Sequence, residues 1–268
     1  MLSKKREEIK AVYDVVVIGS GYGGGVSASR LSRAGYSVCL LERGREFRAG
    51  DFPDTFSEMM KESQSQIDTY HAGEKTALFD MRLYEETSLV VGCGLGGTSL
   101  INANVSLRLD PRVFDADEWP QGIKDDLATL DECYGLAETM LKPATLPEKF
   151  DSLKKYQAHK KSANAIKKDP DFLHAEFYKT PINVNFENKI NHVGVEQREC
   201  TMCGDCVSGC NHTAKNTVAM NYLPDAVNYG AEIYCECSVR HIEKTDTGDW
   251  LVHFYASHLG RDSFDVPT

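Results

Sequence analysis

The clearest pattern of apolar positions lies near the start of the chain. Two short apolar runs, residues 13–18 and 37–41, are rich in β-branched and aliphatic side chains and are typical of buried parallel strands. Between them, small and apolar residues recur on one helical face until Gly35, where a helix is expected to end. These residues are Ala28, Leu31 and Ala34. The pattern therefore predicts a complete βαβ unit.

Three later stretches have helical spacing. In residues 127–141 apolar side chains fall on one face, which predicts a core-facing helix. Residues 151–168 are polar and rich in lysine, as expected of a solvated helix without a function of its own. Residues 216–228 also have helical spacing, and Pro224 inside them predicts a kink or a break.

The other stretches indicate strands or irregular structure. Residues 240–244 and 250–255 alternate on either side of a Thr-Gly pair and predict a hairpin, and residues 263–266 predict one more strand. Residues 47–88 carry aromatic and acidic side chains without a clean period. We expect them to be mostly helical or irregular.

Charge and cysteine usage narrow the class of protein. The 268 residues include 30 basic and 40 acidic side chains, and the net charge of −10 repels phosphate backbones and anionic lipid headgroups. We therefore expect neither nucleic acid nor a membrane surface as a partner. No apolar run approaches the roughly 20 residues of a membrane-spanning helix. Nine cysteines are too sparse for a disulfide scaffold, so we expect a reducing, cytoplasmic location.

The glycines between the first strand and the helix point to a dinucleotide. The first glycine permits a tight turn, the second lets backbone N–H groups approach a pyrophosphate at the helix N-terminus, and the third allows close packing of helix on strand. An acid that can bind a ribose hydroxyl follows the first glycine by 23 positions, near the usual spacing of about 20. A chance glycine-rich turn is the alternative, and this unit alone does not separate FAD from NAD. The expected contact residues are Gly19, Gly21, Tyr22, Gly24, Glu42 and Arg43.

A second glycine cluster, residues 92–102, resembles the first signature of the glucose-methanol-choline (GMC) oxidoreductases. Its Gly-Gly-Thr-Ser-x-hydrophobic-Asn core is matched by residues 96–102. In that family the loop lies along the FAD pyrophosphate and flavin ring. The resemblance therefore implies FAD as the cofactor, with contacts at Gly97, Thr98, Asn102, Asn104 and Val105. Cys93 departs from the family, which usually has Arg, Lys or Asn there.

The resemblance resumes at residues 214–233 and continues to Val239, whose family counterpart holds the adenine through its backbone. It implies an α/β fold in which a Rossmann-like FAD-binding domain carries a β-meander and an inserted, mostly helical or irregular lid region. The expected boundaries are 1–110 for the first part of the FAD-binding domain with the lid at 47–88, 111–199 for a helical insertion, 200–213 for a cysteine-rich loop, and 214–268 for the second part of the FAD-binding domain.

Four cysteines, Cys200, Cys203, Cys206 and Cys210, have the spacing of the bacterial ferredoxin run. Soft thiolates select iron–sulfur clusters or zinc over hard cations, so the run predicts a 4Fe-4S or 3Fe-4S cluster, with structural zinc or redox-inert thiols as alternatives. Asn211 stands where the ferredoxin run usually has proline. Some GMC relatives similar to cholesterol oxidases carry such a loop, and some flavin sugar dehydrogenases of the family hold a cluster.

The resemblance also implies the reaction. We expect hydride transfer to FAD from the hydroxyl-bearing carbon of a sterol, sugar or other alcohol. Electrons would then leave the flavin, through the iron–sulfur cluster where one is present, for oxygen, a quinone or a cytochrome. In the family the catalytic histidine belongs to the C-terminal half. The chain is therefore expected to be the FAD-binding half, without catalytic residues and inactive alone. The alternatives are an NAD(P)H-dependent flavin and iron–sulfur reductase and a non-catalytic flavin-binding fragment.

Overall fold

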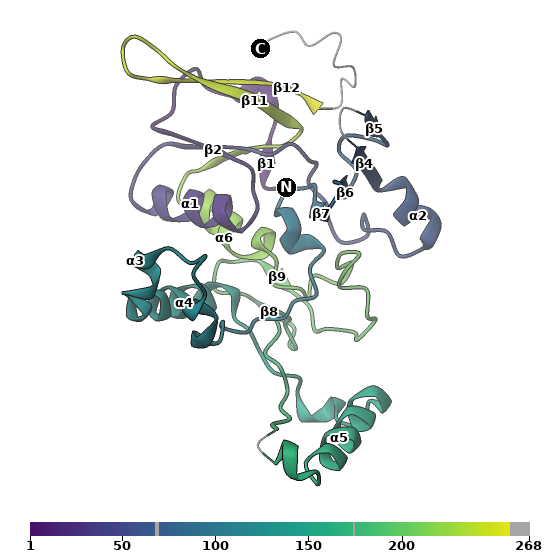
Figure 1. The fold of residues 1–268 in the computed structure, drawn as a ribbon. Coiled ribbons are helices and arrows are strands. Elements are labelled where there is room, and N and C mark those ends of the chain that lie inside the picture. The colour runs from purple at the N-terminus through teal and green to yellow at the C-terminus, as the bar shows by residue number, and fades with distance from the viewer. Residues whose placement is uncertain (68–69, 174, 258–268) are drawn as a thin grey trace. The chain divides into compact units, whose positions relative to one another are not determined.

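The computed structural model describes residues 1–67, 70–173 and 175–257. The chain forms two compact units (Figure 1). The first comprises Met1–Ala103 and Glu187–Thr268, and the second comprises Asn104–Phe186. The predicted insertion, residues 111–199, overlaps the second unit, and the predicted strand at 263–266 lies outside the described residues.

A four-stranded parallel sheet organises the first unit. Its strand order is β1 (Ser3–Lys4), β10 (Glu232–Tyr234), β3 (Val38–Leu41) and β2 (Val15–Ile18). Helix α1 (Tyr22–Arg33) connects β2 with β3, which confirms the predicted βαβ unit. Strands β3 and β10 are buried along their length. Strand β2 was also expected to be buried, but it lies at the edge of the sheet formed by the described residues, and Ile18 is 51% exposed.

Helix α1 packs on a short helical segment from the far end of the chain (Figure 1). A Cβ atom on Gly25 would lie 2.3 Å from Cγ1 of Val218, so the helices approach too closely for a side chain here. The buried carboxylate of Asp225 accepts hydrogen bonds from Ser29 Oγ at 2.6 Å and from Arg33 Nε at 2.8 Å. Burial alone would raise the pKa of Asp225, but these hydrogen bonds hold the pKa below its usual value.

The predicted helix at 216–228 is broken, though not at its proline. It consists of the 3-10 helix η6 (Val218–Met220) and helix α6 (Tyr222–Asn228), which meet at Asn221. Pro224 is the third residue of α6, where a backbone N–H would have no partner within the helix. The proline therefore fits inside the first turn and does not cause the break.

The predicted hairpin is confirmed. Strands β11 (Cys237–Lys244) and β12 (Trp250–Ala256) pair in antiparallel fashion, and Gly248 adopts a φ of 93° in the turn. One face of the hairpin packs on a core cluster formed by Cys39, Leu41, Tyr234 and Cys237. The residues on that face are Val239, Val252 and Phe254.

The expectation of a mostly helical or irregular segment at residues 47–88 is wrong for its second half. After helix α2 (Phe56–Lys61) the chain forms a four-stranded sheet in the order β5 (Tyr70–Ala72), β4 (Ser63–Ile67), β6 (Phe79–Leu83) and β7 (Ser88–Gly92). Strand β4 is polar, and its buried Gln64 donates to the carbonyl of Ala77 at 2.7 Å. An internally satisfied polar strand lacks the apolar alternation by which strands are recognised. Phe47 and Phe52 pack with Leu78, Leu100 and Ile101 in a second core cluster.

The second unit is helical, as predicted. Helix α4 (Leu127–Leu141) has the predicted bounds, but among its described residues only Met140 is buried, so the expected core-facing stripe is half-exposed. Helix α5 (Lys154–Ile166) has no buried residue, as expected of a solvated helix. The remaining short elements are η1 (Arg6–Glu8), η3 (Pro111–Asp115), α3 (Gln121–Lys124), η4 (Glu148–Phe150), η5 (Pro170–Phe172), β8 (Lys189–Ile190) and β9 (Glu196–Gln197).

Candidate cofactor site and cysteine loop

The turn between β2 and α1 has the geometry that its glycines predict. Gly19 adopts a φ of 85°, and Gly21 is the N-cap of α1 with open space where its Cβ would be. A Cβ on Gly24 would lie 1.9 Å from the carbonyl oxygen of Gly19, so only glycine permits this contact between the helix and the turn. The free N–H groups of the first turn of α1 are available to an anion.

The glycine cluster at 92–102 lies against this turn. It ends in the 3-10 helix η2 (Gly97–Leu100), in which Gly97 has a φ of 57° and directs its missing Cβ to within 2.7 Å of Gly21 Cα. Thr98 is exposed, and its Oγ1 accepts a hydrogen bond from Gly92 N at 3.1 Å. Gly97 of the second segment thus lies against Gly21 of the first, 76 residues earlier in the sequence, beside the α1 N-terminus.

A buried hydrogen-bond network fixes the two segments to the end of β3. Ser20 donates to Glu42 Oε2 through its backbone N at 3.0 Å and its Oγ at 2.5 Å, and the same Oγ accepts from Gly96 N at 2.9 Å. The other carboxylate oxygen of Glu42, Oε1, accepts from Gly44 N at 2.7 Å. Glu42 therefore holds the turn in place, and Oε1 keeps capacity for one further donor.

Tyr22 and Asn102, both predicted to contact the cofactor, are brought together. The Asn102 amide donates to the Tyr22 hydroxyl at 2.8 Å, and burial raises the pKa of Tyr22. Asn104 and Val105 lie in the second unit, and Val239 lies on β11 opposite Phe254. Cofactor contact at these three positions stays a prediction.

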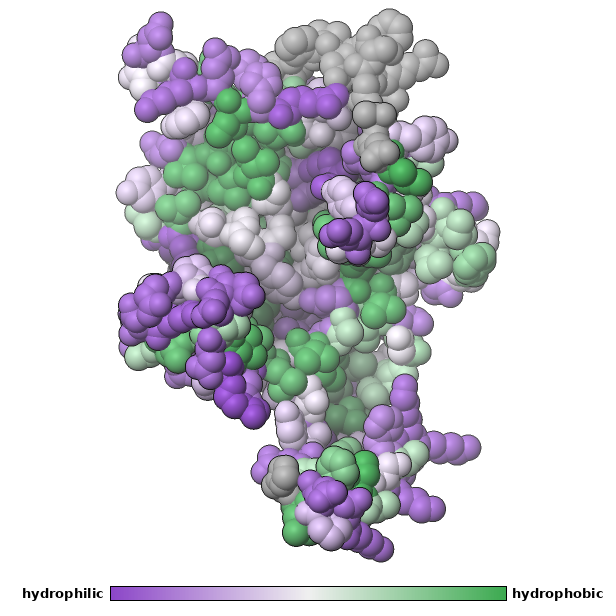
Figure 2. Space-filling model, in the orientation of Figure 1, coloured by the Kyte–Doolittle hydropathy of each residue, from purple (hydrophilic) through white to green (hydrophobic). Residues whose placement is uncertain are grey.

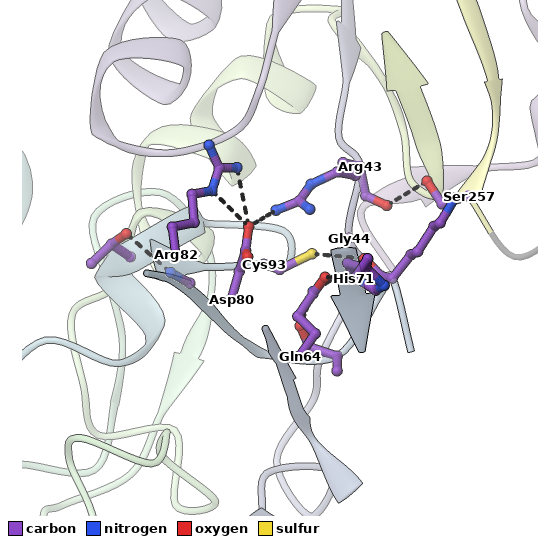
Figure 3. Close-up of polar contacts among 12 residues, drawn as sticks. Arg43, Gly44, Gln64, His71, Asp80, Arg82, Cys93 and Ser257 are labelled. Carbon is purple, nitrogen blue, oxygen red and sulfur yellow. Dashed lines mark hydrogen bonds and ion pairs between the residues drawn. The ribbon is translucent and has the colours of Figure 1, made fainter. Parts of the chain in front are cut away.

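Arg43 contacts the second sheet through its side chain (Figure 3). Its Nη2 lies 2.7 Å from Oδ2 of the buried Asp80, which also accepts from Arg82 at 3.1 and 3.2 Å. Cys93, which replaces the family's usual polar residue, is 1% exposed, and burial raises its pKa to about 11. The thiol is therefore protonated at neutral pH and supplies no charge to the cofactor loop.

Lys215 connects the glycine loop with the cysteine run. Its Nζ donates at 2.8 Å to three backbone carbonyls, those of Leu100, Asn102 and Cys206. The side chain is buried, and this burial lowers the pKa of Lys215 to about 8. A cavity of about 250 Å³ lies beside it, lined in part by Cys210, Phe47 and Phe52.

The cysteine run forms an irregular loop in which all four thiols are free. Asn211, in place of the usual proline, fixes the loop to residues 50–52: its Oδ1 accepts from Gly50 N at 2.8 Å and its Nδ2 donates to Phe52 O at 2.9 Å. Burial raises the pKa of Cys200, and the nearby thiols of the run contribute to the shift. Among the described residues, the thiols of the run form no set of three ligand atoms that lie within 4.8 Å of one another.

Sequence reasoning missed Ser20, Asn211 and Lys215 as organising residues. Ser20 occupies a variable position of the glycine motif, and its partner Gly96 follows 76 residues later. The only sequence feature that could have indicated a structural role for Lys215 is its place as a single lysine in a segment, up to Val218, that the structure shows to be buried. No local pattern could have shown that its three acceptors come from two loops.

These features define a class: an α/β domain in which two glycine segments lie beside a helix N-terminus, an arrangement typical of dinucleotide-binding domains. The GMC oxidoreductase family matches residues 13–249, and the chain belongs to this family, whose members bind FAD. The expected membership is thereby confirmed.

Relatives within the family include sterol and alcohol oxidases. The chain is 32% identical to a cholesterol oxidase of Acinetobacter baumannii over 85% of its own length and 40% of that protein. It is 31% identical to a cholesterol oxidase of Mycobacterium tuberculosis, over 91% and 42% of the two chains. A long-chain-alcohol oxidase of Arabidopsis thaliana is 28% identical, over 82% and 25%. The chain thus spans about two fifths of the cholesterol oxidases it matches.

In the described part of the chain, no helix is both long and apolar enough to cross a membrane.

Proposed function

We propose that the whole protein is an FAD-dependent oxidoreductase that oxidises a hydroxyl group of a sterol or another alcohol. The observation that carries the proposal is the approach of Gly97 to Gly21 beside the α1 N-terminus, because it leaves backbone rather than side chains facing the pyrophosphate. The names of the relatives, cholesterol oxidase and long-chain-alcohol oxidase, support the substrate class and favour oxygen as the acceptor.

Bound FAD would supply a hydride acceptor for the carbon that carries the hydroxyl. The residues of this chain would bind and orient the cofactor in a Rossmann-like domain. The N–H groups of α1 and the exposed Thr98 would hold the phosphates, the remaining capacity of Glu42 would accept a ribose hydroxyl, and the backbone of Val239 would contact the adenine. Residues 47–88, with their four-stranded sheet, would form the lid over the cofactor.

FAD binding is tested by replacing Gly21 with alanine. The space around its Cβ is open, so Gly21→Ala should leave the melting temperature unchanged while its methyl group enters the pyrophosphate space. We expect FAD affinity, measured by quenching of flavin fluorescence, to fall at least about tenfold. Gly135→Ala is the matched control, since this glycine of α4 also has open space and should bind FAD as the parent does. Equal affinity of the two variants would refute the site.

The reaction is tested on the full-length protein under anaerobic conditions. Cholesterol or a long-chain alcohol should bleach the absorbance of bound flavin, and NADPH should not. Bleaching by NADPH alone would favour the reductase alternative. A bound flavin that stays oxidised with these compounds, and also with sugars and short alcohols, would favour a non-catalytic flavin-binding protein.

We further propose that the cysteine run holds an iron–sulfur cluster. The ferredoxin spacing, the four free thiols and the Lys215 contact between this loop and the glycine loop support the proposal. The free state of all nine cysteines also supports a reducing, cytoplasmic compartment. After anaerobic reconstitution, the cluster EPR signal should vanish in Cys203→Ser and persist in Cys133→Ser, an exposed cysteine of α4. Stoichiometric zinc without iron would contradict it.

A further inference from the structure

The outward face of the β11–β12 hairpin carries three potential metal ligands. His241 and His253 are directly opposite each other in the strand register, and Glu243 follows His241 two positions later on the same face. Figure 2 shows hydrophilic residues over the outer end of this hairpin. The opposite face, with Val252 and Phe254, packs on the core.

A β-bulge places both imidazoles on this face. Val239 pairs with Phe254 and faces inward, but the register shifts before His241, which pairs with His253. The extra residue, Arg240, thereby inverts the alternation of β11. Without the bulge, a histidine two positions after Val239 would face the core.

The three side chains lie close together. The two imidazole rings stack with centroids 4.2 Å apart and planes inclined by 13°. His253 Nε2 lies 3.3 Å from Glu243 Oε2 but is buried and makes no hydrogen bond. One ligand atom from each residue lies within 4.8 Å of the other two. A buried ring nitrogen without a hydrogen bond, facing a carboxylate and a second imidazole, is an arrangement that a cation would complete.

We propose that His241, Glu243 and His253 bind one divalent cation of the zinc type on the outer face of the hairpin. Imidazole nitrogen with a carboxylate oxygen suits Zn²⁺, Co²⁺ or Ni²⁺, whereas Mg²⁺ and Ca²⁺ require oxygen ligands throughout. Three protein ligands leave a coordination position for water. The ion would join β11 to β12 beside the turn, and it is independent of FAD and of the cysteine run.

The competing interpretation is a histidine–glutamate ion pair that forms when His253 is protonated and holds no metal. A cation and a proton compete for the same nitrogen, so the two interpretations differ in whether metal stabilises the chain at neutral pH.

The test is a calorimetric titration with Zn²⁺ after the four cysteines of the run are changed to serine, so that these thiolates do not compete. One equivalent should bind, and it should raise the melting temperature. His253→Gln and His241→Gln should each weaken binding at least about tenfold, or about 1.4 kcal/mol. His159→Gln, at an exposed histidine of α5, should bind as the parent does.

If the serine variant does not fold, the parent is titrated with Co²⁺. Nitrogen and oxygen ligation should give visible bands without a sulfur-to-cobalt charge-transfer band, and His253→Gln should lose one such equivalent. Absence of saturable binding, or equal binding by His253→Gln and the parent, overturns the proposal.

Discussion

Two neighbouring glycines of α1 should respond in opposite ways to the same substitution. A Cβ on Gly23 meets nothing within 4 Å, whereas a Cβ on Gly24 would lie 1.9 Å from the carbonyl oxygen of Gly19. Ordinary van der Waals contact begins at 3.4 Å, so in Gly24→Ala the turn and helix must separate by about 1.5 Å. Overpacking of this kind typically costs about 1–3 kcal/mol. Gly23→Ala should instead stabilise the helix by up to about 1 kcal/mol.

Thermal unfolding followed by circular dichroism measures the difference. Domains of 150–250 residues shift by roughly 2–4 °C for each kcal/mol, so Gly24→Ala should melt about 2–12 °C below the parent, and Gly23→Ala at or slightly above it. Gly24→Ala should also bind FAD more weakly, because the displaced turn is the proposed pyrophosphate site. If both variants melt at the same temperature, the packing argument for Gly24 is wrong.

Three further substitutions test the buried polar contacts. Glu42→Gln places an amide donor against the backbone N–H donors of Ser20 and Gly44, and should lower the free energy of unfolding, measured in urea, by about 1–3 kcal/mol. Ser20→Ala should lower it by less. A larger loss in Ser20→Ala than in Glu42→Gln would contradict the network. Asp225→Asn should be less stable at pH 7. The pKa of Asp225 is lowered in the folded state, so the ionised carboxylate stabilises the fold above the unfolded-state pKa, and this stabilisation is lost as pH falls through the folded-state pKa. The melting temperatures of variant and parent should therefore converge in acid. A constant difference between them at all pH values would refute this role. Lys215→Met loses three hydrogen bonds. Since the pKa of Lys215 falls to about 8, the parent should gain stability relative to the variant between about pH 8 and 10.5, and parallel pH profiles would contradict the burial of this charge.

The parts of the fold that the sequence predicted are those governed by local spacing. The βαβ unit, helix α4 and the hairpin follow from apolar periodicity and from glycines that need an unusual backbone, and helix α5 follows from a polar, lysine-rich composition. The second sheet was missed because strand Ser63–Ile67 is polar, and a hydrogen bond of its buried Gln64 is made to a loop carbonyl, that of Ala77. The break near Pro224 was misplaced because a proline in the first helical turn is tolerated.

The candidate site divides in the same way. The structural roles of Gly19 and Gly24 could be predicted, since each follows from the backbone conformation or close approach at its own position. The pyrophosphate contact of Gly21 stays a prediction. The second function of Glu42, holding Ser20 and Gly44, could not, because it depends on contacts that the folded chain creates. The face on which His241 lies could not be predicted either, since one bulge residue inverts the alternation.

The ammonium group of Lys215 has an electrostatic consequence for the cysteine run. Its hydrogen-bond partners are neutral carbonyls, so its positive charge is solvated by dipoles and is not cancelled by them. Cys206 and Cys210 are close enough to the ammonium group that negative charge on them would raise the pKa of this lysine, against the larger effect of burial. The fold therefore places a positive charge beside two thiols of the cysteine run. A ligand of the cysteine run would therefore bind more tightly the more negative its charge.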